Sequence, residues 1–233
     1  MNDSILSNIA LDAIEAKLIT YHGAINGDYF NTLVDVIDTA QQAYRCVTAI
    51  RVDLHYPDKL MGDDMPCLEL SLREDILSRF FKSLDAKLKA LAIRKLKDGK
   101  RVHSRDYHYF WVREQSQSNY PHYHLLLLFN KDDFYTLGVY NDIDSLAGMI
   151  ITAWASAWGV KINRKGNGEL FTLFLGSVYF VQKVHYLNIN ASEHDYRESM
   201  TALLLHAGYL AKTAAKPVGD GKRNMGSSMR VRV

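Results

Sequence analysis

The sequence of 233 residues is poor in the residues that mark disulfide-bonded, collagen-like or disordered proteins. It contains only two cysteines and four prolines. Cys46 and Cys67 lack the short spacing of paired metal ligands, so we expect two free thiols, as in a reducing compartment. The apolar share of 48% and the charged share of 23% are ordinary for a globular protein that buries a sizeable core.

Long apolar runs are absent as well. The run at residues 125–129 is far shorter than the roughly 20 residues that span a membrane as a helix. Residues 1–4 lack the basic-then-apolar order of a signal peptide, so the sequence predicts a cytoplasmic protein without a membrane partner. The phosphate-binding pattern G-x-x-x-x-G-K-[ST] does not occur either, so no nucleotide cofactor is expected.

The net charge of +2 conceals a marked segregation of charge along the chain. Residues 3–38 are acidic, whereas residues 79–105 carry ten basic side chains against two acidic ones, and residues 212–232 are basic again. Such blocks suit the phosphate backbone of DNA, although a solvated helix face with a loose basic tail is an equally good interpretation. The candidate DNA-binding residues are Arg101, Arg105, Lys216, Lys222 and Arg223.

Hydrophobic periodicity predicts an α+β fold with a mainly antiparallel central sheet flanked by helices. Ser71 and Glu74 form a capping-box pattern at the start of a long basic helix. The expected helices cover residues 4–20, 29–43, 71–97, 144–158 and 192–216. The expected strands or strand-rich segments cover residues 46–54, 107–114, 122–129, 170–175 and 178–189, the second and third forming a hairpin.

His122 and His124 form the most informative pattern in the chain. Residues two apart on a strand point to the same face, so the two imidazoles are placed side by side as metal ligands require. The hairpin brings Glu114 opposite His122, and two imidazoles with a carboxylate suit Mg²⁺ or Mn²⁺ bound near a phosphate. The alternatives are two unrelated strand-end histidines and an exposed carboxylate paired with Arg113 or a lysine.

Tyr209 is the second candidate. It lies away from the main apolar stripe of the last predicted helix, with Lys212 one turn later. A lysine there reduces the cost of forming the phenolate that a nucleophilic tyrosine needs. The alternative is an ordinary tyrosine on a half-buried helix face. If the apolar stripe packs on the sheet, Tyr209 points away from the histidines.

The two patterns in this order resemble the Rep class of HUH endonucleases, which initiate rolling-circle replication. Residues 48–57 lie where that class has its first motif. Residues 208–224 (Gly-Tyr-Leu-Ala-Lys-Thr-Ala-Ala-Lys-Pro onward) are similar to the replication initiators of filamentous phages and prophages. The likeness covers residues 44–228 and implies an RRM/palm-like endonuclease domain, which would leave residues 1–43 as a helical extension and residues 229–233 as a basic tail.

The resemblance implies a DNA-nicking mechanism and a role for each matching residue. Position 205, one turn before the tyrosine, is a leucine, so a single-tyrosine enzyme is implied. Such an enzyme forms a 5′-phosphotyrosine link to origin DNA and relies on a host helicase and polymerase. The implied metal ligands are His122, His124 and Glu114, with Tyr209 as nucleophile and Lys212 as auxiliary cation.

Two other functions fit the same residues. A non-catalytic DNA-binding regulator on this fold would bind origin DNA without nicking it. A metal-dependent enzyme for small substrates would have a pocket too narrow for a DNA strand, and Tyr209 would then be incidental. From the sequence, Asp53 and His55 are placed only near the site, and His206 receives no role.

Overall fold

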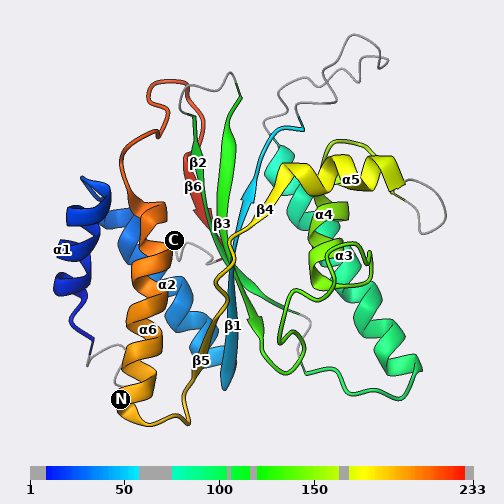
Figure 1. Ribbon diagram of the computed structural model, residues 1–233, viewed down its shortest axis with the longest axis horizontal. Coiled ribbons are helices and arrows are strands. Elements are labelled where there is room, and N and C mark those ends of the chain that lie inside the picture. Colours follow the sequence, from blue (N-terminus) through cyan, green and yellow to red (C-terminus); the bar gives the residue numbers. More distant parts are fainter. Residues whose placement is uncertain (1–8, 58–74, 104–105, 116–119, 163–167, 229–233) are drawn as a thin grey trace. The chain divides into compact units, whose positions relative to one another are not determined.

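The computed structural model describes residues 9–57, 75–103, 106–115, 120–162 and 168–228. The predicted capping box at Ser71 and Glu74 and the candidate Arg105 lie outside the described residues. The helices, shown in Figure 1, are α1 (Leu11–His22), α2 (Gly27–Ala43), α3 (Ile76–Lys97), α4 (Leu146–Ala157), α5 (Gly168–Ser177), α6 (Glu193–Ala207) and the 3₁₀ helix η2 (Gly208–Ala211). The strands are β1 (Cys46–Leu54), β2 (His108–Glu114), β3 (His122–Asn130), β4 (Val178–Phe180), β5 (His185–Asn188) and β6 (Met225–Ser227).

The six strands form one sheet of order β4-β1-β3-β2-β6, and β5 also pairs with β1. The pairings of β2 with β3, of β2 with β6 and of β1 with β5 are antiparallel. β3 lies between β1 and β2, and its residues 123–129 are all buried, as expected for a central strand covered on both faces. The predicted α+β fold with a central sheet and flanking helices is confirmed.

The chain divides into two compact units, and the divisions fall inside β1 and β4, just before β2 and shortly after β3. The first unit contains residues 1–53, 107–133 and 180–233. The second contains residues 54–106 and 134–179.

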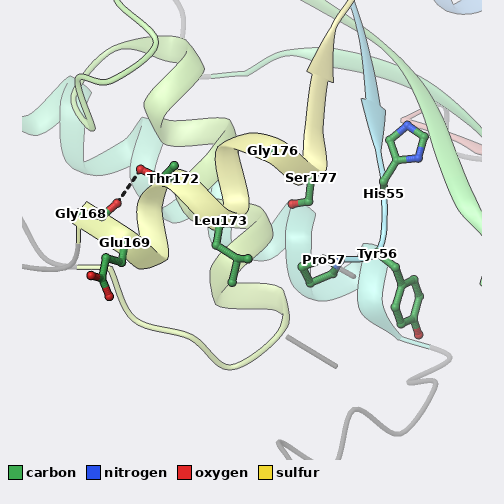
Figure 2. A pocket seen from close by; sticks show the side chains of 9 residues that line it. All are labelled: His55, Tyr56, Pro57, Gly168, Glu169, Thr172, Leu173, Gly176 and Ser177. Atoms are coloured by element: carbon green, nitrogen blue, oxygen red, sulfur yellow. Dashed lines mark hydrogen bonds between the residues drawn. The ribbon is translucent and has the colours of Figure 1, made fainter. Parts of the chain in front are cut away.

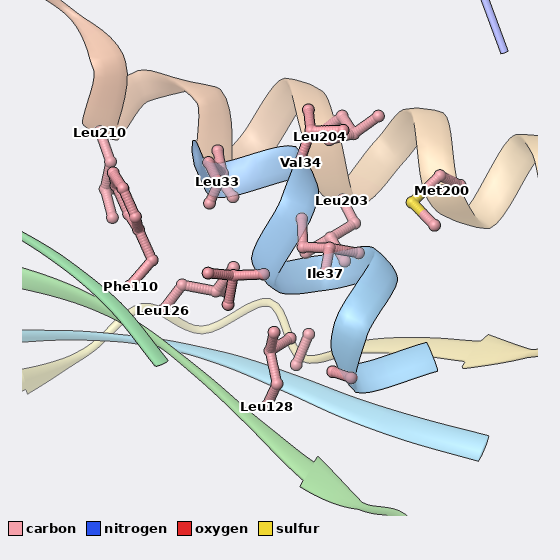
Figure 3. Close-up of a cluster of buried hydrophobic side chains, with 14 of the residues drawn as sticks. Leu33, Val34, Ile37, Phe110, Leu126, Leu128, Met200, Leu203, Leu204 and Leu210 are labelled. Atoms are coloured by element: carbon pink, nitrogen blue, oxygen red, sulfur yellow. The ribbon is translucent and has the colours of Figure 1, made fainter. Parts of the chain in front are cut away.

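The core of the first unit forms where α2 and α6 pack on one face of the sheet (Figure 3), and Ile14 and Leu18 of α1 complete it from beside α6 and η2. Alternate residues of β3 supply Leu126 and Leu128 to this core, and alternate residues of β2 supply Phe110 and Val112. Side chains cap the start of α2 and α6: Asn26 accepts a hydrogen bond from Tyr29 N, and Ser192 accepts one from Asp195 N. Residues 11–43 therefore belong to the same hydrophobic core as the sheet.

The second unit is built around aromatic packing between α3 and α4. Phe80 contacts Trp154 edge to face with ring centroids 6.1 Å apart, and Trp154 contacts Trp158 in the same way. Arg94 of α3 and Asp144 form an ion pair at 2.9 Å. The predicted helix at residues 144–158 is confirmed, and it is buried on nearly all sides rather than along one stripe.

Two predicted elements differ from the structure. The prediction of β-rich structure at residues 170–175 was wrong, because these residues lie in α5, where Phe171 and Phe174 bury one helical face. The last helix was expected to continue to residue 216, but α6 ends at Ala207 and η2 ends at Ala211. The backbone then becomes extended, with ψ of 143° at Lys212. β6 was not predicted.

Within the described ranges, no helix is both long enough and apolar enough to traverse a lipid bilayer.

The junction between α6 and η2 gives a first testable prediction. A Cβ atom on Gly208 would overlap the side chain of Leu18, which is fully buried in α1 and has no room to move. We expect Gly208→Ala to lower the free energy of unfolding by about 1–3 kcal/mol, as overpacked cores do, measured by urea denaturation.

Gly27→Ala is the matched control. Gly27 is the first residue of α2, and a Cβ there meets no atom within 4 Å, so this variant should be at least as stable as the parent. Equal stability of both variants would show that α1 does not pack closely on η2.

Candidate metal and nucleophile site

The sheet face that packs on the hydrophobic core carries polar side chains at one end of its strands. On β3, His122 and His124 continue the row of Leu126 and Leu128, since residues two apart share a face. On β2, Glu114 continues the row of Phe110 and Val112. The antiparallel register places Glu114 opposite His122 and Val112 opposite His124, as the hairpin prediction required.

β1 supplies two more polar groups by the same alternation. Val47 and Ala49 lie in the core, so Arg51 and Asp53 follow them on the same face. Asp53 Oδ1 lies 2.7 Å from His124 Nδ1, and Asp53 Oδ2 lies 3.5 Å from an amino nitrogen of Arg51. Asp53 therefore links the histidine pair to an arginine.

Three side chains are arranged as a metal site. One ligand atom from each of Glu114, His122 and His124 lies within 4.8 Å of the others. Glu114 Oε2 is 3.3 Å from His124 Nε2 and 3.8 Å from His122 Nε2. Both ring nitrogens of His124 are buried, and neither makes a hydrogen bond of normal geometry with a described residue. The donor set of two imidazoles and a carboxylate fits Mn²⁺ or another divalent ion.

Asp53 completes this arrangement from behind the ligand. A carboxylate on one ring nitrogen of a histidine fixes the ring and makes the other nitrogen the ligand. Asp53 lies on Nδ1 of His124, so Nε2 faces Glu114. Burial alone would lower the pKa of His124, but the carboxylates of Asp53 and Glu114 outweigh burial and raise it.

Glu114 is the most buried charge of the site, with 1% of its surface exposed. Two lysines hold it: Lys216 Nζ is 2.6 Å from Oε1, and Lys212 Nζ is 3.0 Å from Oε2. Burial alone would raise the pKa of the Glu114 carboxyl, yet the contacts with His124 and Lys216 lower it to about 2. The carboxylate is therefore ionised at neutral pH.

Tyr209 lies beside the histidines. Its ring is perpendicular to that of His124, with centroids 5.7 Å apart, and its hydroxyl accepts a short hydrogen bond from Lys212 Nζ. The guanidinium of Arg51 lies 4.4 Å from the centroid of the Tyr209 ring. The apolar stripe of α6 does face the core, and the 3₁₀ turn of η2 still brings Tyr209 to the site.

The turn between α1 and α2 holds the tyrosine segment in place. Asn26 N donates to Ala211 O at 2.8 Å, and Thr213 N donates to Ala24 O at 2.9 Å. These two bonds flank Lys212, which forms an isolated bridge with Ile25. His22, at the end of α1, contacts the Tyr209 ring edge to face with centroids 5.1 Å apart. The N-terminal helices therefore contribute to the site itself.

Sequence comparison identifies relatives that share nearly all of this architecture. The sequence model of the YagK/YfjJ C-terminal domain family matches residues 14–228. The chain belongs to this family. The match begins inside α1, so it includes most of the N-terminal helices that hold Tyr209.

Two members come from Escherichia coli (strain K12). The uncharacterized protein YagK is 35% identical over 207 residues, which cover 89% of this chain and 95% of YagK. The uncharacterized protein YfjJ is 33% identical over 203 residues, which cover 86% of this chain and 93% of YfjJ. No solved structure has significant similarity to the chain.

The structure of this family member separates the candidate DNA-binding residues. Arg101, Lys222 and Arg223 are exposed. Lys216 lies against Glu114 instead of on the open surface. The alternative for Glu114 was an exposed carboxylate paired with Arg113 or a lysine. Glu114 is buried and does pair with Lys212 and Lys216, whereas Arg113 pairs with Asp220 at 2.7 Å, which anchors the tail loop to β2.

Arg51, Asp53 and His22 were missed as site residues. The sequence did contain a signal for Arg51 and Asp53. Every second residue from 47 to 53 lies on one face of the strand, and along this row the side chains change from apolar to charged, as those of β3 change between leucine and histidine. His22 has no such signal, since its approach to Tyr209 depends on how α1 packs against η2.

Other polar groups of the chain do not join this site. The second unit has a pocket of about 700 Å³ between residues 55–57 and α5 (Figure 2), and the exposed His55 lies there. Among the described lining residues, His55, Tyr56 and Glu169 are the ionisable ones, so the pocket has no cluster of catalytic groups.

His206 pairs with His185 of β5, and this pair gives a second prediction. Their nitrogens Nε2 (His185) and Nδ1 (His206) are 2.9 Å apart. Burial, His206 and Lys183 lower the pKa of His185 from 6.5 to about 4. Between these values the unfolded chain binds a proton that the folded chain does not, so stability is lost as the pH falls. We expect His185→Gln to lose less stability than the parent between about pH 7 and about pH 4 in urea titrations.

His194→Gln is the control, because His194 is exposed on α6. An unchanged pH dependence in His185→Gln would mean that the buried pair does not contribute to acid sensitivity.

Proposed function

We propose that this protein is a metal-dependent, sequence-specific enzyme that nicks and rejoins single-stranded DNA and so initiates rolling-circle replication of a phage, prophage or plasmid element. The observation that carries the proposal is the convergence of a phenol with a two-histidine, one-carboxylate ligand set, the ring of Tyr209 lying 5.7 Å from that of His124.

Tyr209 is the nucleophile in this scheme. Its oxygen attacks the scissile phosphorus in line, a P–O bond to tyrosine forms, and the bond to the 3′ oxygen breaks. The phenol proton leaves to solvent and the 3′ oxygen takes up a proton. A Mg²⁺ or Mn²⁺ ion bound by Glu114, His122 and His124 supplies Lewis acidity toward a phosphate oxygen.

Lys212 and Arg51 prepare the nucleophile. The Lys212 ammonium donates to the Tyr209 hydroxyl, so a positive charge lies beside the nucleophilic oxygen. Arg51 on the face of the ring and His22 at its edge restrict the ring to one orientation. The energy of the cleaved phosphodiester remains in the tyrosine link, so rejoining needs no nucleotide cofactor.

DNA is the substrate that the charge distribution favours. Arg101, Lys222 and Arg223 are exposed cations, and exposed basic residues bind phosphates with release of counterions. A nicked strand leaves a free 3′ hydroxyl, which a host polymerase extends while a host helicase separates the strands. These two enzymes are the partners that we propose.

The third prediction concerns the covalent link. The purified protein is incubated with Mn²⁺ and single-stranded DNA of randomised sequence that carries a label at its 3′ end, and is then denatured. We expect labelled DNA to remain attached to the protein, because the 5′-phosphotyrosine retains the downstream fragment. Tyr209→Phe should retain DNA binding and lose at least about 10³-fold of the adduct, since it lacks the nucleophilic oxygen.

Tyr179→Phe is the matched control, because Tyr179 is exposed and lies in β4. Adduct that persists in Tyr209→Phe would remove Tyr209 from the mechanism. DNA binding by the parent protein without any adduct would favour a DNA-binding regulator on the same fold. Metal binding without DNA binding would favour an enzyme for small substrates.

The fourth prediction concerns Asp53. Asp53→Asn keeps the shape of the side chain but removes the charge that orients His124. We expect the affinity for Mn²⁺ to fall about 10- to 100-fold, as for other groups behind a metal ligand, measured by electron paramagnetic resonance of free Mn²⁺. Asp12→Asn, at an exposed residue of α1, should bind Mn²⁺ like the parent. An unchanged Mn²⁺ affinity in Asp53→Asn would show that His124 binds the metal without help from Asp53.

A further inference from the structure

Glu114 already has a cation on each of its oxygens. Lys216 is 2.6 Å from Oε1, and Lys212 is 3.0 Å from Oε2, the oxygen that also faces both histidines. The side chain of Lys216 is 8% exposed, so it is nearly withdrawn from solvent. A divalent ion bound by this carboxylate therefore competes with two internal ammonium groups.

The backbone directs Lys216 to this position. Ala215 has φ of 63°, the left-handed region that is unfavourable for a residue with a Cβ atom. Ala215 O accepts a hydrogen bond from Gln115 N at 2.8 Å, so the turn is fastened to the residue that follows Glu114. A strained turn beside a functional group points to a role for the side chain it positions.

Adding a divalent metal ion gives the site an excess of positive charge. Asp53 and Glu114 carry two negative charges, and Arg51, Lys212 and Lys216 carry three positive ones, so the site without metal is close to neutral. A divalent ion raises the sum from about +1 to about +3. A tyrosine phenolate and a phosphodiester bring two negative charges, which offset most of this excess.

We propose that Lys216 is an internal counter-ion of Glu114 that makes metal binding depend on DNA. With no DNA present, Lys216 holds Glu114 and opposes the divalent ion. With a phosphate in the site, the Lys216 ammonium has a second anion to bind and releases the carboxylate oxygen to the metal. Metal and strand therefore bind together, and Lys216 is a positioning residue. This inference rests on the proposed DNA-nicking function.

The experiment measures Mn²⁺ binding, and not activity, in a Tyr209→Phe background that cannot form the covalent link. Free Mn²⁺ is followed by electron paramagnetic resonance with and without single-stranded oligonucleotides of randomised sequence. We expect the DNA to raise the affinity of the protein for Mn²⁺ about tenfold or more, in the usual range of coupling between two ligands.

The second arm replaces Lys216 in the same background. Lys216→Met should bind Mn²⁺ about tenfold more tightly without DNA and lose most of the DNA dependence, because the competing cation is gone. Lys216→Arg, which keeps the charge, should retain the dependence. Lys17→Met removes one charge from an exposed position of α1 and should behave like the parent.

The outcomes separate this inference from the function on which it rests. Equal Mn²⁺ affinity with and without DNA, or an unchanged affinity in Lys216→Met, overturns the inference and leaves the nicking enzyme standing. Absence of Mn²⁺ binding under every condition overturns both. The comparison with and without DNA needs no Lys216 variant, so equal affinities overturn the inference even if Lys216→Met does not fold.

Discussion

The structure of the site depends on the burial of one carboxylate, that of Glu114. An ionised carboxylate withdrawn from water costs several kcal/mol unless cations and hydrogen bonds surround it. Glu114 is 1% exposed and is met by Lys212, Lys216 and the two histidines. Because the lysines come from the segment after η2 and the histidines from β3, satisfying this charge brings the C-terminal segment to the sheet. Tyr209 arrives with it, three residues before Lys212.

The parts of the site that share a strand or a hairpin were predictable. A period of two places His122 and His124 on one face, and the short turn places Glu114 opposite His122. The residue pattern alone does not give the neighbour of β3 on its other side, because strand order is set by long-range packing; only the resemblance to HUH endonucleases placed residues 48–57 beside the histidine strand, where β1 lies. The contact between Asp53 and His124 therefore required the structure, although the change from apolar to charged residues along β1 was visible in the sequence.

Helical periodicity predicted that Tyr209 would point away from the histidines if the apolar stripe packed on the sheet, which conflicts with its expected role as the nucleophile. A continuous helix through residue 216 places the apolar stripe on the core and Tyr209 on the opposite side. In the structure α6 ends at Ala207, and a 3₁₀ turn has three residues per turn instead of 3.6, so η2 alters the direction of each later side chain. The end of a helix is set here by tertiary contacts, in particular Leu18 against Gly208 and the backbone bonds from Ala24 and Asn26. No local pattern reports these contacts. The prediction of strand-rich structure at residues 170–175 failed for a related reason, since a short apolar run does not distinguish a strand from a buried helix.

The same lysines give the buried carboxylate of Glu114 partners that do not depend on a metal ion. Small metal-folded domains remain unfolded without the ion, because their ligands repel one another or lack partners. Here the two carboxylates are neutralised by Arg51, Lys212 and Lys216, so the first unit has no unpaired buried charge of this kind among its site residues. Under the proposal above, such a site is stable without the ion and binds a cation weakly when no phosphate is present. For an enzyme that cuts DNA this arrangement is favourable, because full assembly of the metal with its ligands then waits for a phosphate to occupy the site.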